Sequence, residues 1–368
     1  MVNWLLRNFN MNICYIITST NKCGPVNVLY NLVSNLNANE VRPYIITLRA
    51  DENGKSRRKE FESLGIEVVQ YNPQKQLSEI FSFIKDKQVK IVHSHGIIPD
   101  LVNRKISQRF GSIKCMTTLH NYPVEDYLMS HGKIKGSLMV ALQLFAINKL
   151  NKIACSQAIQ AKFRENLHIK TYAIENGVDF PLENEVINHY RDLPIFLYLG
   201  EINPRKNIEF LVDFFSNHPA YKLWIVGDGE GNYYHSIKDK VRNIHNITMW
   251  GRTETPEEFY KKADYVVSAS YSEGLPMMVL EALSYGLPVI LSDIPAHQET
   301  IINELCGSLY KLNDGQCLEK KIEQILADPP DRKKIYQLSK TKFSSDVMAE
   351  NYVKFYKELV NGKHEINI

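Results

Sequence analysis

The sequence lacks the features that mark several specialised classes of protein. Its 368 residues contain 6 cysteines and no C-x-x-C pair, which indicates free, buried thiols in a reducing cytosol rather than a disulfide framework. No apolar run approaches the roughly 18 residues that cross a bilayer, and the apolar stretch 137–147 suits a buried or interfacial helix. The start of the chain has neither the basic residues nor the long apolar segment of a secretion signal. We interpret residues 1–10 as a candidate leader, because Met11 directly precedes a strand-like run.

Charge is nearly balanced over the whole chain, with 44 Lys and Arg against 41 Asp and Glu. The net charge of +3 is too small for a dedicated nucleic-acid binder, and a hydrophobic content of 44% excludes a disordered chain. Residues 1–190 nevertheless carry 23 basic against 16 acidic residues, whereas residues 191–368 carry 21 against 25. This basic first half, densest over residues 55–59, predicts contact with an anionic surface such as the inner leaflet of a membrane. Uneven scatter of charge is the alternative.

Short apolar segments alternate with helical stretches almost throughout the chain. Their length, their Ile and Val content and their spacing predict βαβ units with parallel strands. The expected strands are 13–17, 44–48, 67–70, 91–94, 114–118, 152–155, 172–174, 195–200, 222–226, 247–250, 265–268 and 288–292. The pattern restarts near Leu193, after a polar and turn-rich stretch at 175–192 that we interpret as a linker.

This pattern predicts an α/β protein with two doubly wound, Rossmann-like domains. We expect a first domain over residues 1–190, a second over 191–343, and a C-terminal helix and tail over 344–368 that return toward the first domain. In open α/β sheets, ligands bind at the carboxyl ends of the strands. Two such sheets in tandem therefore predict a ligand-binding cleft between the domains.

The most informative segment is SEGLPMMVLEA, residues 272–282, which follows an expected strand. Gly274 allows a tight turn in this loop, and Pro276 suits the first turn of a helix. The exposed amides at the start of that helix, for instance those of Met277 and Met278, combine with the helix dipole to form an anion site.

Two acidic residues of the same segment add hydrogen-bonding capacity. Glu281, about one and a half turns into the helix, is suited to accept hydrogen bonds from two adjacent hydroxyls, as on a ribose. Glu273 lies in the loop, where it can reach polar groups deeper in the cleft. The alternative interpretation is an ordinary helix start with two surface glutamates.

This segment resembles the nucleotide-sugar site of glycosyltransferase family 4, whose members have the GT-B fold of two Rossmann-like domains facing a cleft. The likeness rests on the Glu-Gly-Leu-Pro loop, on the second Glu after seven intervening residues, and on the Gly-Leu-Pro-Val-Ile sequence at 286–290. It covers nearly the whole chain from Met11, because further family-like segments occur in order. These are Cys23-Gly24-Pro25, His93-Ser94-His95-Gly96, Thr118-Leu119-His120, Asn176-Gly177-Val178-Asp179, Gly200 with Pro204-Arg205-Lys206-Asn207, and Gly227-Asp228-Gly229.

The resemblance implies a cationic donor site at the start of the second domain. Arg205 and Lys206 follow its first strand, where they are expected to hold a diphosphate and stabilise it as it leaves; a solvated basic turn is the alternative. Many family members place an Arg directly after the glycine equivalent to Gly200, but this chain has Glu201. We therefore expect Arg205 to take that cationic role.

The remaining donor contacts are also inferred from the resemblance. Glu281 resembles the ribose-binding carboxylate, Glu273 the carboxylate near the donor sugar ring, and Gly24 the glycine whose backbone approaches the donor phosphate. The loop that begins at Gly227 has the spacing G-x-G-x-G, not the dinucleotide fingerprint G-x-G-x-x-G, and is interpreted as flanking the nucleoside base. The expected donor-binding residues are Gly24, Arg205, Lys206, Gly227, Gly274, Leu275, Met277, Met278 and Glu281.

Two histidines of the first domain complete the expected site. His120 resembles the histidine that approaches the transferred sugar, where a neutral imidazole is suited to bond a hydroxyl or polarise an acceptor; a structural role is the alternative. His95 is assigned either to the acceptor side or to packing. The expected catalytic residues are His120, Glu273, Arg205 and Lys206.

The resemblance thus implies a retaining glycosyltransferase that moves a sugar from a nucleotide diphosphate-sugar to an acceptor hydroxyl. We expect no cofactor and no metal, since no Asp-x-Asp motif occurs at a strand end, and no nucleic-acid partner. The expected acceptor is a polyprenyl-diphosphate-linked or other glycan in bacterial surface-polysaccharide assembly, such as O-antigen or capsule. The expected location is cytoplasmic, peripheral at the inner face of the cell membrane. The alternatives are a nucleotide-sugar epimerase of the GT-B type and a non-enzymatic sugar-binding protein, while the missing fingerprint disfavours a nicotinamide oxidoreductase.

Overall fold

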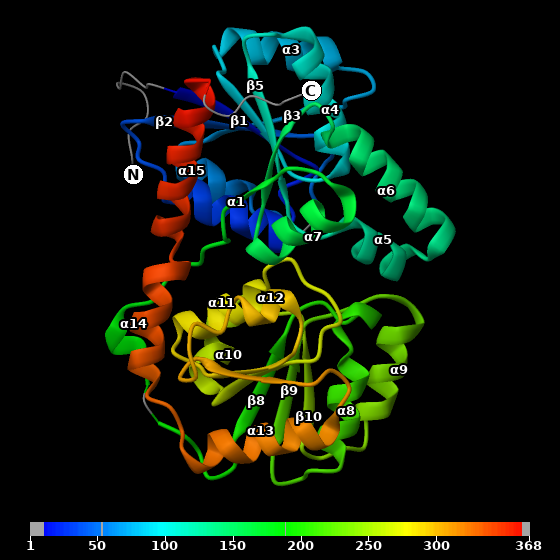
Figure 1. Ribbon diagram of the computed structural model, residues 1–368, viewed down its shortest axis with the longest axis vertical. Coiled ribbons are helices and arrows are strands. Elements are labelled where there is room, and N and C mark those ends of the chain that lie inside the picture. Colours follow the sequence, from blue (N-terminus) through cyan, green and yellow to red (C-terminus); the bar gives the residue numbers. More distant parts are fainter. Residues whose placement is uncertain (1–10, 53, 188, 363–368) are drawn as a thin grey trace. The chain divides into compact units, whose positions relative to one another are not determined.

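The computed structural model describes residues 11–52, 54–187 and 189–362, so the interpretation of residues 1–10 as a leader lies outside the described residues. The chain forms two compact units, drawn in Figure 1. The first contains the described residues up to Tyr127, together with Lys133–Gly177 and the described residues from Ser345 onward. The second contains Leu128–Gly132 and Val178–Ser344.

The first unit is built on a parallel sheet covered by helices (Figure 1). Over the described residues its seven strands follow the order β3-β2-β1-β4-β5-β6-β7. The strands are β1 (Met11–Ile17), β2 (Val41–Thr47), β3 (Glu67–Gln70), β4 (Ile91–Ser94), β5 (Lys114–Leu119), β6 (Asn151–Ala154) and β7 (Tyr172–Ala173). The helices between them are α1 (Gly24–Ser34), α2 (Arg58–Ser63), α3 (Leu77–Asp86), α4 (Ile97–Arg109), α5 (Pro123–His131), α6 (Lys133–Ile147) and α7 (Gln157–Leu167).

The second unit repeats this plan with a six-stranded parallel sheet in the order β10-β9-β8-β11-β12-β13, counted over the described residues. Its strands are β8 (Ile195–Leu199), β9 (Lys222–Val226), β10 (Ile247–Gly251), β11 (Tyr265–Ser268), β12 (Val289–Ser292) and β13 (Gly307–Tyr310). Its helices are η2 (Glu183–Glu185), η3 (Pro204–Lys206), α8 (Ile208–Ser216), α9 (Gly231–Val241), α10 (Pro256–Lys262), α11 (Met277–Ser284), α12 (Pro295–Gln298), α13 (Gly315–Ala327) and α14 (Arg332–Phe343).

The strand order places a topological switch point in each sheet. After β1 the sheet is extended on one side by β2 and β3, and after β4 it is extended on the other side by β5, β6 and β7. In the second unit, β8 is likewise followed by β9 and β10 on one side and β11 by β12 and β13 on the other. Ligands of doubly wound sheets bind outside the carboxyl ends of the strands at such points. The loops that follow β1, β4, β8 and β11 are therefore where a site is expected.

The central strands form because their side chains are apolar on both faces. In β1, whose sequence is MNICYII, all residues but Asn12 are buried, as expected for a parallel strand with helices on each side. The two expected doubly wound α/β units are thus confirmed, and every strand expected from the sequence is present within two or three residues of its bounds. None of the six cysteines, which all lie in the described residues, forms a disulfide; Cys23 is exposed and Cys317 half-buried, so the expectation of buried thiols holds for the other four.

The C-terminal helix α15 (Ser345–Val360) is part of the first unit. Its Tyr356 hydroxyl lies 3.1 Å from that of Tyr15 on β1, and its Tyr352 hydroxyl lies 2.9 Å from Thr118 Oγ1 on β5. These contacts are made by fully buried side chains, so the helix is a component of the first core, and its expected return to the first unit is confirmed.

The expected boundary at 190/191 and the structural division at 177/178 differ. Residues 178–187 lie in the second unit because they bind α14, where the Tyr336 hydroxyl donates to the Pro181 carbonyl at 2.8 Å and Arg332 Nη1 donates to the Ile187 carbonyl at 3.3 Å. The polar, turn-rich sequence at 175–192 begins after the end of β7, but it does not show which unit the connecting segment packs against.

Candidate functional site

The switch point of the second unit gathers the charged residues singled out in the sequence. Arg205 and Lys206 lie in the short helix η3, the next element after β8, and Glu273 lies in the loop after β11. Asn203 caps η3, since its side chain accepts a hydrogen bond from the Lys206 amide at 3.2 Å. The Tyr271 amide donates to the Arg205 carbonyl at 2.9 Å, which ties the two loops together through their backbones.

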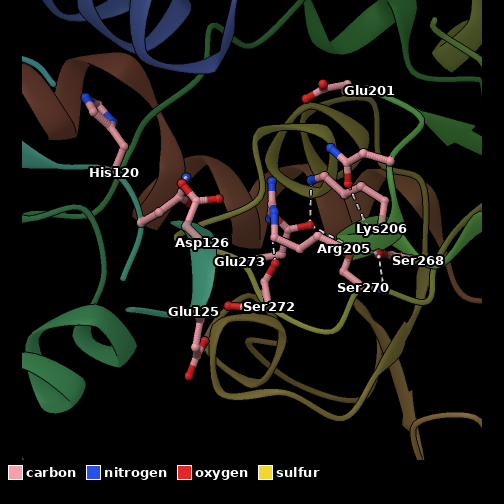
Figure 2. Close-up of polar contacts among 12 residues, drawn as sticks. His120, Glu125, Asp126, Glu201, Arg205, Lys206, Ser268, Ser270, Ser272 and Glu273 are labelled. Carbon is pink, nitrogen blue, oxygen red and sulfur yellow. Dashed lines mark hydrogen bonds and ion pairs between the residues drawn. The ribbon is translucent and has the colours of Figure 1, made fainter. Parts of the chain in front are cut away.

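Glu273 is the centre of this charged group (Figure 2). Its Oε2 accepts from Arg205 Nη1 at 3.0 Å, and its Oε1 accepts from Lys206 Nζ at 2.6 Å and from Ser270 Oγ at 2.7 Å. Arg205 Nη1 also donates to the Ser272 carbonyl at 2.6 Å. The Glu273 side chain is 6% exposed, whereas those of Arg205 and Lys206 are 12% and 19% exposed. The carboxylate is therefore the buried member, and the two cations keep a face toward solvent.

The ionisation of Glu273 follows from this geometry. Burial alone opposes its charged form, but Lys206 and Arg205 outweigh that effect and lower the pKa of the carboxyl to about 2. Glu273 is therefore ionised at neutral pH and neutralises one of the two cations. Together Arg205, Lys206 and Glu273 carry a formal charge of +1 and are held in place by the hydrogen bonds above, an arrangement suited to binding a diphosphate.

Glycines allow the ends of β8 and β9 to meet closely beside this group. A Cβ atom on Gly227, which has φ +137°, would lie 1.9 Å from the Gly200 carbonyl oxygen. Any side chain there would displace the loop that leads to η3. Gly274 is not among the described glycines with positive φ, and Pro276 lies at the N-cap of α11, one residue before the helix begins.

Helix α11 presents the other expected donor residues. Its first residues, Met277 and Met278, leave backbone amides without partners within the helix, and Met278 Sδ accepts from the Leu199 amide at 3.0 Å. Further along, Glu281 Oε2 accepts a hydrogen bond of 2.7 Å from the hydroxyl of Tyr260 on α10. Tyr260 is fully buried, so it holds one oxygen of Glu281 in a defined place.

The first unit holds a separate group of histidines at the ends of β4 and β5. His95 Nδ1 lies 2.8 Å from His120 Nε2, so one of these nitrogens donates to the other. The rings of His93 and His95 stack with centroids 4.5 Å apart, and those of His95 and His120 with centroids 5.1 Å apart. His93 is held by Thr118 Oγ1 at 2.8 Å and by the Tyr356 hydroxyl at 2.9 Å.

Burial keeps these histidines neutral. Desolvation lowers the pKa of His120 to about 4 and that of His93 to about 3, and it lowers the pKa of His95 well below its ordinary value. Neutral imidazoles offer one donor and one acceptor nitrogen each. His95 Nε2 is buried and has no hydrogen-bond partner among the described residues.

A pocket of about 200 Å³ opens beside these rings within the first unit. His95 and His120 line it together with Pro25, Asp126 and Gln143. Gly24, the first residue of α1, directly precedes Pro25, and an added Cβ on Gly24 would meet no atom within 4 Å. The structure thus brings His95 and His120 together in one pocket and groups Arg205 and Lys206 with Glu273. The roles expected for all of these residues stay predictions.

Sequence reasoning missed several residues that orient the charged ones. Ser270 bonds Glu273, Tyr260 bonds Glu281, and the buried His297 contributes to the charge environment of Glu273. Ser270 comes two residues after the end of β11, so its place near a strand end at the switch point was an available signal. Tyr260 and His297 come from helices, and no local pattern marks either one.

Two family models match successive parts of the chain. Residues 23–180 match Glycosyltransferase Family 4, and residues 179–342 match Glycosyl transferases group 1. The first covers most of the described first unit before α15, and the second covers nearly all of the second unit.

Curated relatives resemble the chain over much of its length. The O-antigen biosynthesis glycosyltransferase WclY of Escherichia coli is 27% identical over 379 residues, covering 95% of this chain and 99% of that protein. The UDP-Gal:alpha-D-GlcNAc-diphosphoundecaprenol alpha-1,3-galactosyltransferase of the same species is 27% identical over 267 residues, covering 65% of this chain and 67% of that protein.

Solved structures share the fold. Sucrose-phosphate synthase from Thermosynechococcus elongatus superposes with a TM-score of 0.77 at 20% identity, covering 96% of this chain and all of that one. Anabaena Alr3699/HepE in complex with UDP-glucose gives a TM-score of 0.78 at 15% identity, covering 95% of this chain and all of that one. These likenesses extend over both units.

Proposed function

Because this chain is a family 4-like glycosyltransferase with the GT-B fold, we propose that its donor is a nucleotide diphosphate-sugar bound at the β8–β11 switch point. The observation that supports this most is the pairing of Arg205 and Lys206 with the buried Glu273. Glu281, oriented by Tyr260, binds the ribose hydroxyls, and the amides at the start of α11 face the phosphates.

The proposed reaction transfers the sugar with retention of anomeric configuration. The bond between the anomeric carbon and the diphosphate oxygen breaks, and the acceptor hydroxyl oxygen forms the new bond on the same face. Arg205 and Lys206 stabilise the charge that develops on the departing diphosphate. The departing phosphate takes the hydroxyl proton, so the scheme needs no enzymatic nucleophile. His120 and His95 bind sugar hydroxyls as neutral imidazoles, and the unpartnered His95 Nε2 is available for this purpose.

For the acceptor, we propose a polyprenyl-diphosphate-linked glycan in bacterial surface-polysaccharide assembly, such as that of O-antigen, on the cytoplasmic face of the membrane. One relative is named for O-antigen biosynthesis and another for a diphosphoundecaprenol-linked acceptor. The names of both relatives support this acceptor class.

The proposal is tested by incubating the protein with a radiolabelled nucleotide sugar and a polyprenyl-diphosphate-linked monosaccharide. We expect label in the lipid extract, and an α-to-α or β-to-β relationship between donor and product by nuclear magnetic resonance. Inverted product would contradict the retaining mechanism. If the label instead remains on the nucleotide as an altered sugar, the protein is an epimerase, and the acceptor part of the proposal fails.

A further inference from the structure

Helix α6 carries an apolar stripe that the described chain leaves exposed. Ile134 is 91% exposed, Leu138 71%, Leu142 40% and Phe145 56%. At about 100° per residue these four side chains fall within roughly a quarter of the helix circumference. They therefore form one continuous surface, the α6 stripe, rather than scattered exposed residues.

The opposite face of the same helix is already packed. Gly136, Gln143, Ala146 and Ile147 are buried, and α6 packs against α4 within the first unit (Figure 1). The α6 stripe lies on the face opposite this packed one, and among the described residues it stays exposed. An exposed apolar patch of this kind marks a site that binds another apolar surface, such as a partner protein or a membrane.

The charges around the stripe select among possible partners. Lys133 and Lys135 begin the helix and Lys149 follows it, and residues 127–164 contain no Asp or Glu. Arg104 of α4 lies over the Phe145 ring, with its Cζ 4.1 Å from the ring centroid, and Nη1 donates to the Phe145 carbonyl at 2.8 Å. An apolar stripe on a helix with lysines at both ends is complementary to a surface with apolar depth and anionic headgroups.

We infer that α6 is a membrane-docking helix that inserts its stripe among the acyl chains of an anionic bilayer surface. A second copy of this chain is a poorer partner, because a symmetric contact would place Lys133, Lys135 and their equivalents against like charges. No helix of the described residues is long and apolar enough to cross a membrane. The contact inferred is therefore one that lies along the surface, as expected for a 15-residue helix.

The basic segment at 55–59 is a weaker surface of this kind. Lys55 pairs with Glu52 at 2.7 Å, Arg57 with Glu60 at 2.9 Å, and Arg58 with Glu62 at 3.3 Å. These acids neutralise much of the cluster, and none of the large exposed apolar residues in the described part of the chain lies within this segment. Contact between this segment and an anionic surface stays a prediction from the sequence.

The buried face of α6 connects the docking surface to the histidine pocket. Gln143 Nε2 donates to Asp100 Oδ2 at 2.6 Å, and its Oε1 accepts from the Tyr127 hydroxyl at 3.0 Å. Gln143 and Tyr127 both line the pocket that contains His95 and His120. Docking of α6 therefore fixes this pocket close to the membrane surface. The position of the pocket matters only if the acceptor is lipid-linked, so this part of the inference rests on the proposed function. The docking of α6 does not depend on the proposed function.

The test is flotation of the full-length protein with vesicles, in the absence of donor and acceptor. One vesicle type contains phosphatidylglycerol and phosphatidylcholine, and the other contains phosphatidylcholine alone. We expect the wild type to float with the anionic vesicles, and an Ile134→Gln/Leu138→Gln variant to lose binding by about tenfold or more. Leu182→Gln is the matched control, because Leu182 is 70% exposed in the second unit, and its binding should equal that of the wild type.

A charge variant separates the two contributions to binding. Lys133→Gln/Lys135→Gln should weaken binding to the anionic vesicles at low salt, and high salt should reduce the difference from the wild type. The inference is overturned if the wild type does not float, if the Ile134/Leu138 variant floats as well as the wild type, or if this variant instead dissociates a dimer seen by analytical ultracentrifugation. Because all substituted side chains are exposed, circular dichroism and melting temperature should be unchanged. If the protein fails to bind a nucleotide sugar, the proposed function is contradicted but the results of vesicle flotation are unchanged.

Discussion

The Nζ atom of Lys206 lies 2.6 Å from Oε1 of Glu273, which joins the loop after β8 to the loop after β11. The lysine comes from a short helix and the glutamate from a turn, so this ion pair links two separate strand-end loops. Because the glutamate is nearly inaccessible and the lysine is not, the pair presents a positive group at a strand-end site. This relationship carries the assignment of a diphosphate site.

Substitution of Lys206 by Gln should weaken binding of a nucleoside diphosphate, for which UDP serves as the probe because the names of one relative and of several structural neighbours contain it. A charge-assisted hydrogen bond contributes about 1.5–3 kcal/mol, which corresponds to a loss of roughly 10- to 100-fold in affinity. Isothermal titration calorimetry measures the effect. Lys222→Gln is the control, because Lys222 begins β9 at the opposite end of the strands and should not alter affinity. Equal affinities of wild type and Lys206→Gln would contradict the assignment.

Replacing Glu273 by Gln should destabilise the protein by about 3 kcal/mol, since it leaves two partly buried cations without their carboxylate. The wild type also gains a pH dependence from this group. With its pKa lowered to about 2, Glu273 contributes stability that is present above about pH 4.5 and is lost as the pH falls toward 2. Urea denaturation across this range should show that loss in the wild type and a smaller one in the variant. Parallel curves would rule out the proposed ionisation.

Tyr260→Phe removes the hydroxyl that holds Glu281 and leaves the buried ring in place. A hydrogen bond of this kind contributes about 0.5–1.5 kcal/mol, so the KM for the donor should rise roughly two- to tenfold while kcat changes little. Tyr190→Phe is the control. It removes a similar hydrogen bond, from the Tyr190 hydroxyl to the Pro330 carbonyl at 2.6 Å, and this bond involves no candidate donor-binding residue. A fall in kcat with unchanged KM would show that Tyr260 does not act through donor binding.

The stacked histidines predict a second pH dependence of stability. Their folded-state pKa values are lowered, to about 3 for His93 and about 4 for His120, from an ordinary value of 6.5. Their contribution to stability is therefore present above about pH 6.5 and is lost as the pH falls through 4, because the unfolded chain takes up protons first. His120→Gln should reduce the slope of the unfolding free energy between pH 6.5 and 4.

Asp100 must be separated from this measurement because it acts in the opposite direction. Burial raises its pKa to about 7, so its contribution to stability is present below about pH 3.8 and is lost as the pH rises through 7. The histidine slope is best measured in an Asp100→Asn background, where it should be steeper than in the wild type. A slope unaffected by His120→Gln in that background would show that His120 is not held neutral.

The sequence was sufficient for the sheets because their strands are short, apolar and regularly spaced. The exception is β13, Gly307–Tyr310, which begins with a glycine of positive φ and has two half-buried residues. A strand that starts in this way has no apolar pattern to distinguish it from a loop. The strand β13 forms because it pairs with β12 in the sheet, and the conformational preferences of its own residues do not predict it.

The candidate site was predictable where function imposes a local pattern and hidden where it depends on packing. Glu273 and Glu281 stand in one recognisable segment, and Lys206 follows a strand end. Tyr260 reaches Glu281 from another helix, and the three histidine rings meet only because β4 and β5 are adjacent in the sheet. Likewise, the apolar stretch 137–147 indicated a buried or interfacial helix, but only the fold shows which face of α6 stays exposed.

The central claim is that the second unit binds a nucleotide diphosphate-sugar through Lys206 and Glu281. Its most direct test is a thermal-shift panel of nucleotide sugars against the wild type, Lys206→Gln and Glu281→Ala. A ligand at 100 times its Kd adds about 2.7 kcal/mol to the stability of the folded state. We predict that at least one nucleotide sugar raises the Tm of the wild type and that both variants lose most of this rise. No shift with any member of the panel, or equal shifts in all three proteins, would contradict the account.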